Sequence, residues 1–213
     1  MKSFYILIIA VFCFNCTNDK ALELAEIHHS NITEILDVSP AYLFYNTANI
    51  DSLEVNKRNL ISTTNWLVNV DKRLSLKQAI PAIKALQDKK ENASHKNKNA
   101  KNYFTAFNPN SKNLCFLEFT ATTFRLNTKA TEHIKTLHDT TAIVDISSEA
   151  IRYQNQVYKL NTFINALNTT NNSVKLVLNF DQHITFQDYL QFKDALLTIT
   201  KTAVLIDRNE FIY

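Results

Sequence analysis

Within one stretch of the chain, residues 174–190, the spacing of the hydrophobic residues changes from that of a strand to that of a helix. It opens with a largely apolar run that contains β-branched residues, which is typical of a buried strand. Asn179 and Asp181 end this run, and side chains of these types favour turns because they bond nearby backbone. Thr185 then stands three residues before Asp188 at the head of an apolar run with helical spacing, which predicts a capped helix. The stretch therefore predicts a strand, a tight turn and a helix.

The same order of residue types occurs earlier, in residues 66–80, at an ungapped offset of about 110 residues. The matching positions are Asn69 with Asn179, Asp71 with Asp181, and Ser75 with Thr185. We interpret these six residues as structural turn and cap residues. The repeat predicts two copies of one supersecondary unit.

Further strands and helices are predicted around the second copy. The strands are 142–146, 150–153, 157–158 and 203–206, and the helices are 160–167 and 185–199. We summarise the second half as the order β-β-α-β-α-β, an open-sheet α+β unit with helices packed on one face. In the first half, 41–45 and 66–70 are strand-like, and Pro81 predicts a kink or a late start in the helix after Ser75.

The domain boundaries follow from these elements. Residues 40–125 form a first α+β unit and 140–213 a second, joined by a connection with a short helix near 131–137. Residues 16–39 are expected to be a tether with a short helix. The basic segment 88–102 could be an anion-binding arm, but its charges lack apolar spacing, which favours a solvated, mobile loop.

Composition narrows the function classes. The chain has 213 residues, 46% of them hydrophobic, which is enough for a core. Glycine is absent, which excludes phosphate-binding P-loops, dinucleotide fingerprints and glycine-flanked serine elbows. Asn is expected to take the left-handed turn positions instead. The net charge of +3 gives no reason to expect a nucleic-acid partner.

The N-terminus has one lysine and a short apolar run, residues 3–14. As a helix this run would be roughly 18 Å long, against about 30 Å for the hydrocarbon core of a bilayer. It ends at Cys16, which precedes polar residues, and so resembles a bacterial lipoprotein signal peptide over 1–15. That resemblance implies that Cys16 is lipidated and faces the periplasm, with the choice of membrane, including the outer membrane, left open. The alternative is an uncleaved short membrane anchor.

The second half, from Ala142 to Tyr213, resembles the periplasmic domain of the ExbD/TolR biopolymer transport family. The resemblance lies in the Val144-Asp145-Ile146 strand, the hairpin 150–158, and the strand–turn–helix stretch with Thr185-x-x-Asp188-Tyr189. Family members are subunits of proton-driven envelope motors and carry a transmembrane helix with an acidic residue. The N-terminal apolar run here is too short and has no Asp or Glu, so no proton-relay residue is expected. What the resemblance implies is a binding module for envelope partners.

Residues suited to catalysis do not form a recognisable constellation. His28 and His29 are adjacent, and His133 and His138 are five apart, off the spacing of a zinc-binding helix. Asp181 and His183 could form an acid–base pair, but turn and solvent roles explain them better. Cys115 lies outside the predicted signal peptide and lipidation site, in an apolar strand-like run. A cysteine in such a run is usually a small buried hydrophobic residue.

We therefore expect a non-catalytic, lipid-anchored envelope protein without cofactor or metal. Its partners are expected to be the membrane, through the lipid, and envelope transport-motor proteins or the cell wall; homo-oligomerisation stays open. The alternatives are a membrane-anchored ExbD-type motor subunit and, less favoured, an envelope hydrolase that uses Asp181 and His183.

Overall fold

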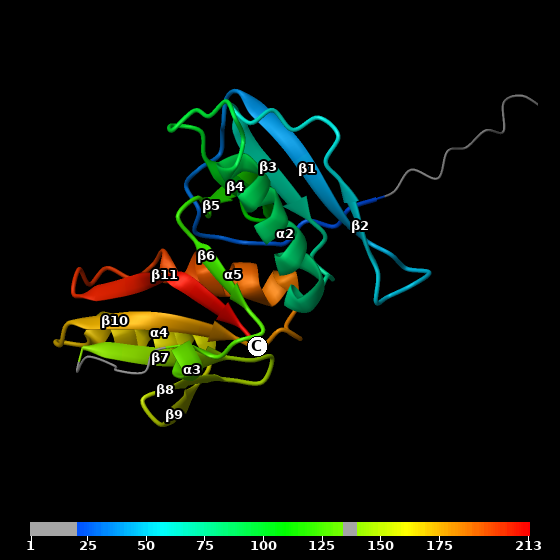
Figure 1. Ribbon diagram of the computed structural model, residues 1–213. Coiled ribbons are helices and arrows are strands. Elements are labelled where there is room, and N and C mark those ends of the chain that lie inside the picture. The colour runs from blue at the N-terminus through cyan, green and yellow to red at the C-terminus, as the bar shows by residue number, and fades with distance from the viewer. Residues whose placement is uncertain (1–20, 134–139) are drawn as a thin grey trace, which may run out of the picture.

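The computed structural model describes residues 21–133 and 140–213, which fold into two mixed sheets with helices packed against them (Figure 1). This confirms the α+β class predicted above. The elements of the first sheet and its helix are β1 (Val38–Tyr45), β2 (Leu53–Asn56), β3 (Asn65–Val70), α2 (Leu76–Glu91), β4 (Asn102–Asn108) and β5 (Asn113–Glu118). Those of the second are β6 (Thr123–Leu126), α3 (Ala130–His133), β7 (Thr141–Ile146), β8 (Ile151–Tyr153), β9 (Gln156–Tyr158), α4 (Leu160–Thr169), β10 (Val174–Phe180), α5 (Phe186–Leu196) and β11 (Val204–Ile212).

The first sheet has the order β2-β1-β3-β4-β5. Strands β1, β3 and β4 are parallel, and β2 and β5 pair antiparallel at the two edges. In β3 the residues Trp66, Val68 and Val70 are buried and alternate with half-buried ones, which is the period expected of a strand with one face on the core. Helix α2 connects β3 to β4 and buries Leu76, Ile80 and further apolar residues.

The second sheet has the order β6-β11-β10-β7-β8-β9. Strands β7, β10, β11 and β6 are parallel, and the β8–β9 hairpin adds two antiparallel strands. The two strands predicted at 150–153 and 157–158 form this hairpin, whereas the summarised order β-β-α-β-α-β has one strand too few. Helices α4 and α5 cover one face, where the ring of Phe180 meets Tyr189 and Phe192. On the other face Val177 packs with Ala130 of α3, so β10 is buried on both sides.

The two repeated strand–turn–helix stretches occupy equivalent places. Strand β3 lies between the parallel strands β1 and β4, and β10 lies between the parallel strands β7 and β11. Each is followed by the helix that leads to its next parallel neighbour, α2 or α5.

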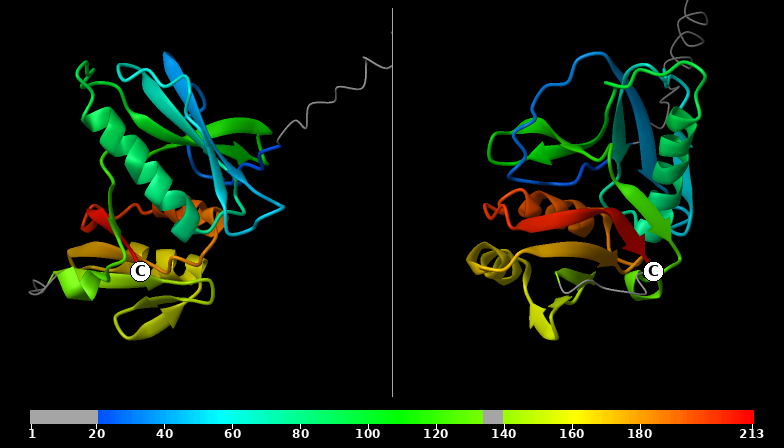
Figure 2. Two further views of the ribbon diagram at one scale, coloured as in Figure 1. Left: turned by 45° about the vertical axis from the view of Figure 1, so that its right-hand side comes forward. Right: turned by 60° about the vertical axis from the view of Figure 1, so that its left-hand side comes forward.

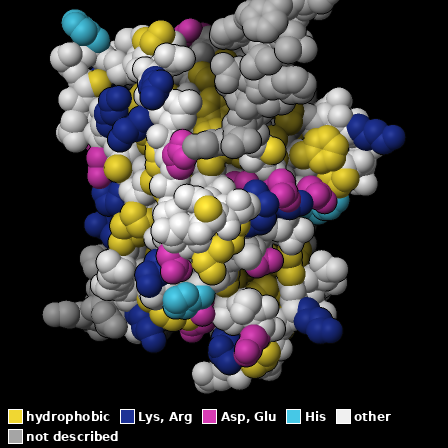
Figure 3. All heavy atoms as spheres, turned by 90° about the vertical axis from the view of Figure 1, so that its right-hand side faces the viewer, with side chains coloured by type: hydrophobic (Ala, Val, Ile, Leu, Met, Phe, Trp, Pro, Cys, Tyr) yellow, Lys and Arg dark blue, Asp and Glu magenta, His cyan; other side chains and the backbone are white. Residues whose placement is uncertain are grey.

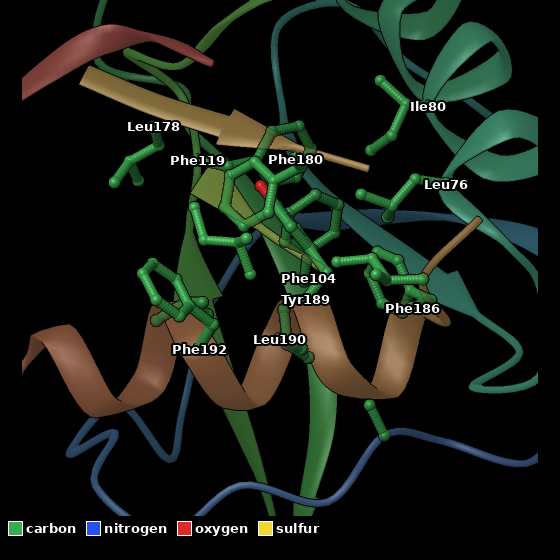
Figure 4. Close-up of a cluster of buried hydrophobic side chains, with 14 of the residues drawn as sticks. Leu76, Ile80, Phe104, Phe119, Leu178, Phe180, Phe186, Tyr189, Leu190 and Phe192 are labelled. Atoms are coloured by element: carbon green, nitrogen blue, oxygen red, sulfur yellow. The ribbon is translucent and has the colours of Figure 1, made fainter. Parts of the chain in front are cut away.

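One hydrophobic core serves both sheets. Figure 4 shows Leu76 and Ile80 of α2, Phe104 of β4, and residues of β10 and α5 converging on it. The ring of Phe104 lies 5.2 Å from that of Phe186 and 6.2 Å from that of Tyr189, both edge to face, a favourable geometry for buried aromatic pairs. Two views place α5 between the two sheets (Figure 2). The two units are therefore not independently packed.

The tether with a short helix expected for residues 16–39 is wrong for the described part, residues 21–37, which contain no helix. Ala25 and Ile27 are fully buried. The N–H of Phe107 donates to the carbonyl of Ala25 at 2.9 Å, and the N–H of Ile27 donates to the carbonyl of Phe107 at 3.1 Å. The segment stays extended because distant strands satisfy its backbone groups.

Other boundaries also differ from the predictions. Strand β6 pairs with β11, so it belongs to the second sheet and not to the unit 40–125. Helix α2 begins at Leu76 and runs through Pro81, so the late start is wrong. Of the helix expected near 131–137, α3 covers its first turn and the rest lies outside the described residues.

Left-handed backbone occurs without glycine, as predicted. Asn127 and Asn155 have φ values of 53° and 62°. Asp37, Lys112 and Gln154 take positive φ as well, so Asn is not alone in this role. Gln154 and Asn155 form the turn between β8 and β9, where two successive positive φ values suit the twist of a hairpin.

Candidate binding surface at the open edge of β11

Strand β11 is only half covered on its outer side. On its inner side it pairs with β10 at Val204–Ile206 and again at Glu210–Ile212. On its outer side β6 pairs only with Asn209–Ile212. Within the described ranges, no strand pairs with the outer edge of residues 204–208.

The backbone groups that face this open edge can be assigned from the ladder. The N–H of Val174 donates to the carbonyl of Ala203 at 2.9 Å. In a parallel pair, successive residues of one strand direct their backbone groups alternately to the two sides. Leu205 therefore bonds to β10, and Ile206 directs its N–H and its carbonyl to the open edge. The N–H of Val204 is already used, because it donates to the carbonyl of Lys201.

Two large apolar side chains are exposed on this part of the strand. Leu205 is 57% exposed and Ile206 is 39% exposed. A single exposed apolar residue needs no explanation. Adjacent exposed residues beside unpaired backbone groups, however, form a template on which another strand can pair.

A bulge ends the open stretch. The register passes from the pair Leu176–Ile206 to the pair Leu178–Glu210, so the three residues 207–209 lie opposite Val177 alone. Asp207 holds the bulge by accepting from the backbone N–H of Asn209 at 2.7 Å and from its amide at 2.8 Å. Such a bulge limits how far an added strand can continue.

An ion pair between Asp207 and Lys175 of β10 reinforces the bulge, with Nζ 2.5 Å from the carboxylate. Burial raises the pKa of Asp207, but the hydrogen bonds from Lys175 and Asn209 outweigh it, so the pKa lies below its ordinary value.

A buried polar cluster connects the far side of the bulge to α5. Glu210 is 1% exposed. Its carboxylate accepts a hydrogen bond from the hydroxyl of Tyr189 at 2.7 Å and pairs with the ammonium of Lys193. Burial, and then the charge of Glu210, raises the pKa of Tyr189 well above its ordinary value. Because its partners already engage both oxygens, the carboxylate serves to anchor β11 on α5.

A shallow hollow lies beside the bulge, between β11 and the connection from β5 to β6. It is lined by residues 118–122 together with Lys193, Asp207, Arg208 and Glu210. Arg208 is exposed, and among the described residues it forms no ion pair. A strand added along Val204–Ile206 would thus end next to a free guanidinium group.

The turn and cap residues predicted from the repeat lie at the two helix starts. Thr185 caps α5, and its Oγ1 accepts from the backbone N–H of Asp188 at 3.1 Å. Ser75 precedes α2, and its hydroxyl and backbone N–H both donate to Oε1 of Gln78. Asp71 is fully buried and accepts from the guanidinium of Arg73 and two backbone N–H groups, those of Arg73 and Glu23.

Asn69 and Asn179 are not turn residues, contrary to prediction, because both lie inside strands. The amide of Asn69 donates to the carbonyl of Ala41 at 2.9 Å, and that of Asn179 donates to the carboxylate of Asp145 at 2.5 Å. Each amide thereby links its central strand to the adjacent parallel one. The side-chain oxygen Oδ1 of Asn179 also accepts from the backbone N–H of Ala130 at 3.1 Å.

The histidine candidates take structural or exposed positions. The carboxylate of Asp181 accepts from the backbone N–H of His183 at 2.8 Å, which is a turn contact. The backbone N–H groups of His28 and His29 donate to Asp194, a carboxylate of α5 that is 2% exposed. The side chains of His133 and His138 lie outside the described part.

The two cysteines of interest differ in what the structure describes. Cys115 is buried, and burial raises the pKa of its thiol to about 11, which opposes thiolate formation. Cys16, the predicted lipidation site, lies outside the described residues.

The sequence pattern did not predict that the residues of the β11 surface form one continuous strand. The run 203–206 predicts a strand, and the polar residues 207–210 that follow predict a turn, yet one strand with a bulge spans both. Residues 207–212 read Asp-Arg-Asn-Glu-Phe-Ile, so the alternation of polar and apolar residues that marks a strand with one buried face is absent and gave no local signal.

Within residues 21–133 and 140–213, no helix is long and apolar enough to cross a membrane. The same part of the chain shows no group of three His, Cys, Asp or Glu residues that could hold a metal ion. Comparison with known proteins gives no match: no family model, no curated protein and no solved structure matches this chain.

Proposed function

We propose that this chain is a non-catalytic binding module of the bacterial cell envelope, anchored by lipid at Cys16. It docks a partner by accepting an extended segment along the open edge of β11. The observation that carries the proposal is the outward-facing backbone of Ile206 beside the exposed side chain of Leu205. Addition of a strand to a sheet edge supplies affinity through main-chain hydrogen bonds.

The way the fold holds its N-terminal segment supports action close to a membrane. The carbonyl of Glu23 accepts from the N–H of Lys72 at 2.8 Å, and Gln187 bonds both backbone groups of Glu26. Seven residues separate Cys16 from Glu23 along the chain, which allows a reach of about 25 Å at most. In an anchored protein, Glu23 would therefore stay within about 25 Å of the lipidated residue, with the folded domain extending from there.

The surface indicates the chemistry of the partner segment. It should be extended and carry an apolar side chain that covers Leu205 or Ile206. An acidic side chain near its end would meet Arg208 beside the bulge. Envelope transport-motor subunits and cell-wall-binding proteins are the partner classes that the ExbD/TolR resemblance favours.

Site-specific cross-linking tests the docking edge. A photo-activated amino acid at position 205, in cells that produce the full chain, should give an adduct with an extended segment of an envelope protein. Ile206→Pro should abolish the adduct, because proline lacks the outward N–H and leaves the bonds to β10 intact. Ile206→Val keeps the N–H and should retain the adduct. A cross-linker at Ile50, which is 62% exposed in the connection between β1 and β2, is the positional control.

The proposal fails if the adduct persists in Ile206→Pro, or if position 50 captures the same protein. An adduct of twice the mass of the chain would identify a second copy as the occupant and would also overturn it.

The anchor is tested separately with Cys16→Ala. The parent should lose residues 1–15, gain lipid mass and fractionate with membranes, and the variant should do none of these. A parent that retains Met1 would instead favour the uncleaved anchor of a motor subunit.

A further inference from the structure

A second hollow lies on the side of the molecule away from the described start of the chain. It is formed by the C-terminal half of α2, the loop 92–101 and the connection 120–124. The cations that line it are Lys84, Lys90, Lys96, Lys98 and Arg208, and the acids are Asp88 and Glu91.

Most of these cations lack an acidic partner. Lys84 pairs with Asp88 at 2.8 Å. Lys96, Lys98 and Arg208 form no ion pair among the described residues. Positive charge therefore outweighs negative charge in the hollow.

The buried end of the hollow holds a lysine without a counterion. Lys90 is 9% exposed, and its ammonium donates to the carbonyl of Lys101 and to the amide oxygen of Asn102, each at 2.9 Å. It also lies 5.2 Å from the centre of the Trp66 ring. Burial lowers the pKa of Lys90 to about 8, since neutral acceptors compensate only part of the lost hydration. An ammonium has three donors, and these two bonds use two of them.

The loop that carries two of the cations is fastened to the fold. The hydroxyl of Ser62 donates to the carbonyl of His95 at 2.8 Å, and the amide of Asn97 donates to the carbonyl of Thr63 at 3.2 Å. The side chains of the loop are exposed, as expected of a solvated segment. These bonds nevertheless hold Lys96 and Lys98 at the rim.

We propose that this hollow binds a phosphate-bearing ligand, with Lys96, Lys98 and Arg208 at its rim and Lys90 at its buried end. Clustered ammonium and guanidinium groups are the protein groups that bind phosphate most strongly. The hydroxyls of Thr122 and Thr123 line the same hollow and make no hydrogen bond among the described residues, so they can donate as well.

The position of the hollow favours a soluble or polymeric phosphate over a headgroup of the anchoring membrane. The described chain begins on one side, and the loop 92–101 lies on the opposite side (Figures 1 and 2). On the side that faces the viewer in Figure 3, acidic and basic side chains are intermixed without a large patch of one sign.

Titration of the full chain with tripolyphosphate, followed by calorimetry, tests the site. Lys96→Gln/Lys98→Gln should weaken binding about tenfold or more, because two unpaired cations are lost. Lys57→Gln/Lys112→Gln removes the same charge outside the hollow and should leave the affinity within about twofold.

A pH series with inorganic sulfate, whose charge is constant over this range, reports on the buried end. An anion favours protonated Lys90, so affinity should be highest below pH 8 and should fall above it. The other charged groups that line the hollow with Lys90 are Lys84, Asp88 and Glu91 of α2, Lys96 and Lys98 of the loop, and Arg208 of β11. Lys90→Met should remove this pH dependence. If Lys90→Met does not fold, the comparison of the two double variants still tests whether the hollow binds phosphate.

Vesicles distinguish the source of the phosphate. If Lys96→Gln/Lys98→Gln weakens tripolyphosphate binding but not binding to phosphatidylglycerol vesicles, the ligand is a soluble or polymeric phosphate, as we expect. If both weaken, relative to phosphatidylcholine vesicles, a headgroup is the source. Equal loss in the two double variants, or no saturable binding, would overturn the proposal. These variants leave unchanged both the docking edge at Ile206 and Arg208, the residue that the two proposals share, so the two proposals fail separately.

Discussion

Ser75 and Thr185, the residues that precede the two repeated helices, pair with each other as an isolated antiparallel bridge. The N–H of Leu76 donates to the carbonyl of Ile184 at 3.0 Å, and the N–H of Phe186 donates to the carbonyl of Leu74 at 2.7 Å. Each helix thus satisfies a free N–H of its first turn with a carbonyl of the turn before the other helix.

The exchange is reciprocal at the next position too. The backbone N–H of Lys77 donates to the carbonyl of Gln182 at 2.8 Å, and the backbone N–H of Gln187 donates to the carbonyl of Lys72 at 3.1 Å. The two copies of the strand–turn–helix unit are therefore joined about a local twofold axis that passes near the bridge.

This junction predicts that the two sheets unfold together. Phe192→Ala removes a ring that is 2% exposed and packs on Phe163 of α4 and Phe180 of β10. We expect a loss of about 3–5 kcal/mol in the free energy of unfolding. The fluorescence of Trp66, the single tryptophan and a residue of the first sheet, should report this loss in full during urea denaturation. An unchanged Trp66 transition beside a shifted circular dichroism signal would show that the units are independent.

The two helix caps should differ in strength. Thr185→Ala removes the hydroxyl that accepts from Asp188, so it should cost about 1 kcal/mol of unfolding free energy. Ser75→Ala should cost only a few tenths of that, about 0.3 kcal/mol, because Gln78 still accepts from the backbone N–H of residue 75. Equal costs in thermal or urea denaturation would contradict these assignments.

Asp71 should contribute to acid sensitivity. Burial raises its pKa, but hydrogen bonds from Arg73 and Glu23 outweigh this, and its pKa is lowered in the folded protein. A lowered folded pKa gives stability that is present above the unfolded value of about 3.9 and is lost as the pH falls through the folded value. Asp71→Asn should lower the unfolding free energy at pH 7 by about 2 kcal/mol. The variant should also lose less stability than the parent below about pH 4. Urea denaturation between pH 2 and 7 would measure this. An equal loss of unfolding free energy in the variant and the parent would contradict the prediction.

Local patterns predicted the helix starts at Ser75 and Thr185, because caps and apolar spacing depend on neighbours in sequence. They failed at the extended segment around Ala25, since the groups that hold Glu26 come from Gln187, 161 residues away. They failed also at β11, where local polar residues resembled a turn but Tyr189 and Lys193 of α5 hold Glu210 in a strand. The sequence also could not show that Lys96 and Lys98 of the basic loop line one hollow with Arg208, because residues about 110 positions apart are brought to that hollow only by the fold.

The exchange rate of the Ile206 amide, measured by NMR, tests the docking edge most directly. In the isolated full chain we expect this amide to exchange rapidly, while that of Leu205, bonded to β10, is protected. In the complex with the partner captured at position 205, the Ile206 amide should exchange roughly 100-fold or more slowly. A protected Ile206 amide in the isolated chain, or an unchanged rate in the complex, would contradict the account.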